Sequence, residues 1–134
     1  MAARDIPLRL ATGPFLVWTG VRKLQQPERG DRLLESASTS LPQLVDVFGS
    51  EPERFARALG VLELGLGAWL ASGLRSRGAG LALSAFAGAT LSLLFTEPAN
   101  RLPGSAWEPS PRGLPLAKDV WLLGAGLSLA LGGR

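Results

Sequence analysis

The sequence predicts an all-α membrane protein, an antiparallel bundle of four transmembrane helices that forms a single domain over residues 1–134. Four apolar stretches carry this prediction, and each is 18 to 20 residues long: 6–24, 55–74, 78–95 and 114–131. At 1.5 Å of rise per residue, a helix of that length just crosses a hydrocarbon core about 30 Å thick. The connections between the stretches are rich in proline, glycine and charged residues, as expected for segments outside the bilayer.

The first stretch begins near Ile6, where Pro7 suits the first turn of a helix. The basic start of the chain resembles a secretory signal. The apolar run continues to Leu24, however, and no small-residue cleavage site follows it. We therefore expect a membrane helix that is retained in the protein and that ends at Arg22 and Lys23.

The connection over residues 25–54 is polar, but it contains one periodic segment. In residues 41–49 the apolar side chains recur at helical spacing, at Leu41, Leu44, Val45 and Phe48. This pattern favours a short amphipathic helix that lies on the bilayer or caps the bundle, and an ordinary packed loop is the alternative.

The second and third stretches are joined by a tight turn over residues 72–78, which makes them antiparallel neighbours. Residues 96–113 hold four prolines and predict an irregular surface loop before the last stretch. An even number of spans places both termini on one side. That side carries Arg4, Arg9, Arg75, Arg77 and Arg134 against Asp5, so basic residues in short segments favour cytoplasmic termini.

Glu63 lies near the middle of the second stretch. A carboxylate at that depth costs about 2.5 kcal/mol or more unless it is neutralised or paired. Gly60 and Gly67 stand three positions before it and four positions after it, on the same helical face. Small residues in membrane helices line close helix–helix contacts, so this spacing directs Glu63 into the bundle.

The predicted topology brings further charged residues to the half of the bundle that contains Glu63. We expect Lys118 to be its first ion-pair partner and Lys23 the second, with Asp119 nearby. Such a pair either fixes helix register or serves as a ligand or proton site, and the sequence leaves both open. Arg9, near the opposite face, is expected to be a snorkelling anchor. The candidates for an intramembrane ion pair or ligand site are thus Glu63, Lys118, Lys23, Asp119, Arg9 and Trp121.

The composition excludes several classes of function. The chain has no cysteine and no histidine, so it lacks thiol redox pairs and iron–sulfur ligands, the commonest metal ligand and the usual general base. We therefore predict no catalytic residues, no metal site and no enzymatic activity of the chain alone. Fourteen basic residues face eleven acidic ones without a basic run interleaved with aromatics, which argues against nucleic-acid binding.

Several short motifs together resemble the DoxX-like family of small four-helix bacterial membrane proteins. They are Arg9-Leu-Ala-Thr-Gly13, Gly20-Val-Arg-Lys23-Leu24, the Gly-x-x-Glu run that ends at Glu63, and the Lys118-Asp-Val-Trp segment. The family's recurring basic and acidic positions correspond to Arg9, Lys23, Glu63 and Lys118. The resemblance implies a bacterial inner-membrane protein with a supporting or quinone-proximal role, since relatives are described as membrane subunits of thiosulfate:quinone oxidoreductase or as membrane partners of soluble redox enzymes.

Three functions are compatible with these observations. The first is a non-catalytic subunit or anchor of a larger, redox or respiratory, complex. It would have membrane lipids and one or more proteins as partners. The second is a membrane protein that binds a quinone or lipid at a Glu/Lys site between the helices, and such a molecule is the cofactor that the sequence leaves open. The third is a small proton-linked transporter, although four spans are few and no inverted repeat is visible.

Overall fold

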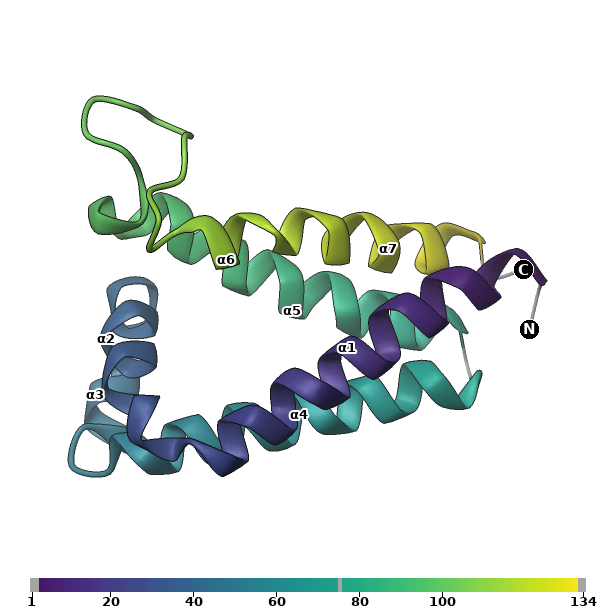
Figure 1. The fold of residues 1–134 in the computed structure, drawn as a ribbon, viewed down its shortest axis with the longest axis horizontal. Coiled ribbons are helices and arrows are strands. Elements are labelled where there is room, and N and C mark those ends of the chain that lie inside the picture. Colours follow the sequence, from purple (N-terminus) through teal and green to yellow (C-terminus); the bar gives the residue numbers. More distant parts are fainter. Residues whose placement is uncertain (1–2, 75, 133–134) are drawn as a thin grey trace.

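The computed structural model describes residues 3–74 and 76–132 of the chain, and these residues fold into helices and their connections. Four long helical segments run antiparallel in sequence order, which confirms the predicted fold class (Figure 1). They are α1 (Ile6–Gln25), α4 (Pro52–Ser72), α5 (Ser76–Thr96) and a last segment made of α6 (Leu114–Ala117) and α7 (Asp119–Gly132).

Three of these segments are long and apolar enough to cross a membrane, namely Pro52–Ser72, Ser76–Thr96 and Leu114–Gly132. Helix α1 is of similar length, 20 residues, and it carries Arg9 near its start with Arg22 and Lys23 in its last turn. It runs through Pro14 without a break, because a proline removes only one backbone hydrogen bond and neighbouring helices support the rest.

The helices associate as two pairs, α1 with α4 and α5 with α7 (Figure 1). Glycines bring the first pair into backbone contact. A methyl group at Gly20 would lie 2.6 Å from the Gly60 carbonyl oxygen, and one at Gly67 would lie 2.7 Å from that of Gly13. Gly80 approaches α7 in the same way. Because lipid tails are as apolar as leucine, such close packing is a main source of helix association in a membrane.

The two pairs lie close together at the end that holds the start of α1 and the end of α7, and they diverge toward the other end (Figure 1). At the closed end Arg4 donates a hydrogen bond to the Gly132 carbonyl, so the beginning and the end of the described chain meet there. The α4–α5 turn lies at this end too, and Gly73 takes the left-handed conformation, with φ of 77°, that ends α4.

At the diverging end, the connection after α1 is folded rather than extended. A short helix, α3 (Gln43–Phe48), lies within residues 41–49, as the periodic spacing predicted. Helix α2 (Gly30–Ser40) was not predicted, because its sequence is mostly polar and has no long apolar run. It contacts both α4 and α5, and so bridges the two helix pairs (Figure 1).

The 96–113 connection, expected to be an irregular loop, contains an ordered hairpin-like projection. Residues Arg101 and Pro109 form an isolated antiparallel bridge, and the Leu102 amide donates to the Glu108 carbonyl at 2.9 Å. We call residues 101–109 the finger. It rests on Asn100, which is 1% exposed and donates through Nδ2 to the Leu93 carbonyl at 2.9 Å.

Candidate functional site

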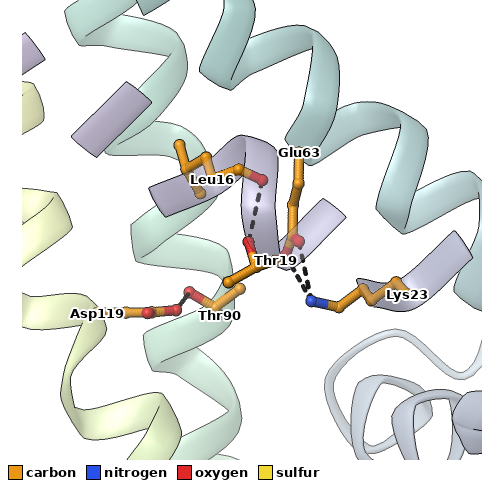
Figure 2. A network of polar contacts seen from close by, with 6 residues as sticks. All are labelled: Leu16, Thr19, Lys23, Glu63, Thr90 and Asp119. Atoms are coloured by element: carbon orange, nitrogen blue, oxygen red, sulfur yellow. Dashed lines mark hydrogen bonds and ion pairs between the residues drawn. The ribbon is translucent and has the colours of Figure 1, made fainter. Parts of the chain in front are cut away.

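Glu63 lies on the face of α4 that packs against α1, as its spacing from Gly60 and Gly67 predicts. It is 5% exposed. The Nζ of Lys23 donates to both carboxylate oxygens of Glu63 at 2.9 Å (Figure 2). A methyl group at Gly60 would lie 3.1 Å from the Lys23 Cβ, so this glycine leaves room for the lysine stem. An ion pair therefore joins α1 to α4 inside the bundle.

The expectation that Lys118 is the first partner of Glu63 is wrong. Lys118 occupies the junction between α6 and α7, and its side chain is exposed. Lys118 itself is in the helical conformation, but its neighbour Asp119 takes the position that faces α5. Successive helical residues are about 100° apart around the axis, so Lys118 is turned to the surface. Lys23, the second candidate, takes the position.

Asp119 begins α7 and faces α5, where its carboxylate accepts a hydrogen bond from the Thr90 hydroxyl (Figure 2). It is also close enough to Glu63 and Lys23 to interact with them electrostatically. Thr90 was not among the predicted site residues, because a threonine in an apolar helix commonly bonds to its own backbone, as Thr19 does to the Leu16 carbonyl at 3.1 Å.

Lys23, Glu63, Thr90 and Asp119 form what we call the polar cluster. Each residue comes from a different long helix, and the cluster lies toward the end at which the helix pairs diverge (Figures 1 and 2). It combines an ammonium group, two carboxyl groups and a hydroxyl group in an otherwise apolar bundle. Such a set can donate and accept hydrogen bonds to a polar ligand, and charges at this depth are commonly functional.

Arg9 is buried between helices and does not extend along the outside of the bundle, which corrects its expected role as a snorkelling anchor. It is 2% exposed and lies at the closed end, away from the polar cluster. One guanidinium nitrogen donates to the Leu70 carbonyl at 2.6 Å, and the other terminal nitrogen donates to the Ser76 hydroxyl at 2.6 Å. Arg9 thus fastens the end of α4 and the start of α5 to α1.

Trp121 also lies outside the cluster, because it points outward from α7 and is 75% exposed. On α1, Trp18 is likewise exposed, and the Arg22 guanidinium lies 5.2 Å from the centre of its ring. Outward indoles near the end of a membrane helix are typical of the lipid–water interface. A ligand site that includes Lys118 and Trp121 is therefore not supported by this geometry.

A hollow of about 480 Å³ lies outside the bundle, where the connection after α1 meets the start of α4. Two ion pairs on its rim, Arg54 with Glu51 and Arg57 with Glu53, are both 3.8 Å long and well exposed, so they contribute little to stability. Its lining is mainly acidic: Glu28, Asp31, Ser50, Glu51, Pro52, Glu53, Arg54 and Arg57. Within the described residues, no group of three or more carboxylate, histidine or cysteine side chains could hold a metal ion.

The helices and their apolar outer faces define a small multi-pass α-helical membrane protein. A sequence model of the DoxX family matches residues 5–96, which is more than half of the chain, and the protein belongs to the DoxX family. The matched region contains Arg9, Lys23, Glu63 and Thr90, whereas Lys118 and Asp119 follow it. No curated protein and no solved structure matched the chain.

Proposed function

We propose that this DoxX family protein is a non-catalytic subunit or anchor of a larger membrane complex, and that its protein partner docks on α3. The observation that carries the proposal is the exposed apolar surface of this helix. Val45 and Val47 of α3 are 50% and 65% exposed, and Leu41, two residues before the helix, is 57% exposed, although α3 is folded against the rest of the chain. Exposed apolar groups on an ordered element favour a binding surface.

The charges around α3 favour a protein over a lipid surface as its partner. Between Gly30 and Glu53 a single basic residue, Arg32, stands against five acidic ones: Asp31, Glu35, Asp46, Glu51 and Glu53. Segments that bind anionic lipid headgroups are instead rich in lysine and arginine. The hollow, whose lining takes in Ser50 and Glu51 just after α3 and holds four acidic against two basic side chains, suits a partner that presents basic side chains around an apolar centre.

Photocrosslinking at position 47 tests this proposal in cells that make the protein from its native locus. With a photoreactive amino acid in place of Val47, we expect a discrete protein adduct that weakens when Asp46→Lys removes the charge complementarity. The matched control carries the same group at Val61, which is 59% exposed on the outer face of α4 and should label lipid. Equal protein adducts at both positions, or none at position 47, would contradict the proposal.

The redox or respiratory nature of the complex is supported by the family to which the chain belongs. So is its location in the bacterial inner membrane. The basic residues at the closed end support an orientation with both termini in the cytoplasm, and α3 and the finger would then face the other side. In this role the bundle supplies a fixed membrane attachment, and the chemistry belongs to the partner.

A second candidate function is the binding of a quinone- or lipid-like molecule at the polar cluster. It is favoured by the convergence of four polar side chains between two diverging helix pairs. The Asp119 carboxylate, which already accepts a hydrogen bond from the Thr90 hydroxyl, can accept another from a polar headgroup, and the apolar helices suit an apolar tail.

Photoreactive analogues of a quinone and of a phospholipid, added to the protein in lipid nanodiscs, test this second function. Labelling near the cluster should fall in Asp119→Asn and Thr90→Val. It should persist in Ser92→Ala, whose hydroxyl bonds to the Ala89 carbonyl of its own helix. Labelling that is unchanged in Asp119→Asn would exclude this site.

A further inference from the structure

We infer that the finger, residues 101–109, is a lipid-contacting element that inserts Trp107 into the headgroup region of the bilayer beside α7. This inference does not depend on the proposed function, which concerns α3. It starts from the exposure of the indole: Trp107 is 72% exposed. When the membrane interface covers a large exposed aromatic side chain, the free energy of the system falls, because apolar surface is removed from water.

The finger is internally braced, so the position of Trp107 is defined. The bridge between Arg101 and Pro109 closes its base, and the Ser105 hydroxyl accepts the Glu108 amide at 2.9 Å near the tip. Gly104 takes a φ of 78°, a left-handed conformation that glycine adopts without steric cost. A braced loop loses little further entropy when its tip inserts.

The direction of the finger identifies what covers it. Figure 1 shows the connection between α5 and α6 extending sideways from the end of the bundle, on the side where α7 lies. The outer face of α7 is strongly apolar and exposed, with Val120, Trp121, Leu127 and Leu131 at its surface. In a multi-pass membrane protein this face contacts lipid. A projection that overhangs it lies above the same lipids, at the level of their headgroups.

The chemical character of the finger also indicates that it contacts lipid headgroups. Trp is enriched at membrane–water interfaces, where its ring is partly buried and its N–H stays hydrated. Trp121, near the start of α7, is a second exposed indole. Between Glu97 and Gly113 two arginines balance two glutamates, so the finger has no excess acidic charge that anionic headgroups would repel. It differs in this respect from the acidic α2–α3 segment.

Fluorescence quenching by brominated phospholipids tests the inference on the full-length protein in nanodiscs. The emission lost when Trp107→Ser is compared with the native protein reports Trp107 alone, and a residue so exposed can be replaced without disturbing the fold. We expect the Trp107 emission to be blue-shifted, strongly reduced by lipids brominated near the headgroup, and weakly sensitive to iodide in solution.

A second variant separates this result from the docking proposal. Val47→Trp places an indole on α3, and we expect bromolipids to leave the added emission unquenched while iodide quenches it. Trp107 emission that resembles a water-exposed indole, with strong iodide quenching and no effect of bromolipid, would overturn the inference. It would do so without affecting the α3 proposal, which rests on the crosslinking at position 47.

Discussion

The Nζ of Lys23 lies 2.9 Å from both carboxylate oxygens of Glu63, and this pair joins the end of α1 to the middle of α4. The Lys23 side chain is 23% exposed and that of Glu63 is 6% exposed. The two charges depend on each other, because the buried carboxylate and the partly buried ammonium group would each be uncompensated if the partner were removed. The pair is the structural centre of the polar cluster.

The first prediction concerns this pair. Glu63→Ala and Lys23→Ala should each lower the unfolding free energy by about 3–5 kcal/mol, since each leaves one charge unpaired in a low-dielectric surrounding. The double variant should lose clearly less than the sum. Denaturant titration in mixed micelles measures these values, and Lys118→Ala is the control, because its exposed side chain should tolerate the change. Additive losses would show that the two residues do not interact.

The second prediction concerns the glycine contact between α1 and α4. Gly67→Ala places a methyl group 2.7 Å from the Gly13 carbonyl oxygen, so we expect a loss of about 1–3 kcal/mol of stability. Gly65→Ala lies in the same helix, where an added methyl would meet no described atom within 4 Å, and it should be neutral or slightly stabilising. Thermal unfolding of the two variants in the same detergent compares them. A larger loss for Gly65→Ala would exclude this packing.

The third prediction concerns Arg9 at the closed end. Arg9→Ala removes two charge-assisted hydrogen bonds, to the Leu70 carbonyl and the Ser76 hydroxyl. It should therefore lower the free energy of unfolding by about 3 kcal/mol or more. We expect faster hydrogen exchange or proteolysis at the α4–α5 turn as well. The control is Arg22→Ala, because Arg22 is exposed and its guanidinium lies over the outward Trp18 ring, 5.2 Å from the ring centre. Equal stability of both variants would contradict the role of Arg9 in holding the α4–α5 turn against α1.

The fourth prediction concerns topology. A reporter fused after Arg134 should be cytoplasmic, whereas one inserted within residues 102–108 should lie on the opposite side, because α5 and the α6–α7 segment cross the membrane on either side of this loop. Paired reporters that are active on opposite sides of the membrane measure both positions. The same compartment for both insertions would contradict the number of spans.

The fifth prediction concerns chemistry. A chain without cysteine or histidine offers carboxylates, amines, indoles and hydroxyls, none of which exchanges electrons readily. We expect the purified protein to show no haem band, no stoichiometric metal and no turnover alone. Absorption spectroscopy and elemental analysis measure these properties. A redox spectrum intrinsic to the purified chain would contradict a purely supporting role.

The polar cluster was only partly predictable from sequence. The glycines around Glu63 were sufficient to direct it inward, and Asp119 was correctly brought toward it. Thr90 carried no signal, since its hydroxyl differs from that of any other helical threonine only through the carboxylate opposite. The role of Arg9 was predicted wrongly because a residue at that depth near a helix end commonly snorkels. The groups that it binds belong to a turn far away in the sequence, so the spacing within its own helix could not reveal them.

Sequence alone determined the class of fold and the four long segments, because hydropathy and length report the transfer of a helix into lipid without reference to any neighbour. The expected stretches 6–24, 55–74, 78–95 and 114–131 end within three residues of the observed helices. Tertiary structure decided which helices pair and which lysine reaches Glu63. Spacing along one helix defines which residues share a face, but the direction of that face depends on close backbone contacts with another helix. These arise only when the helices pack together.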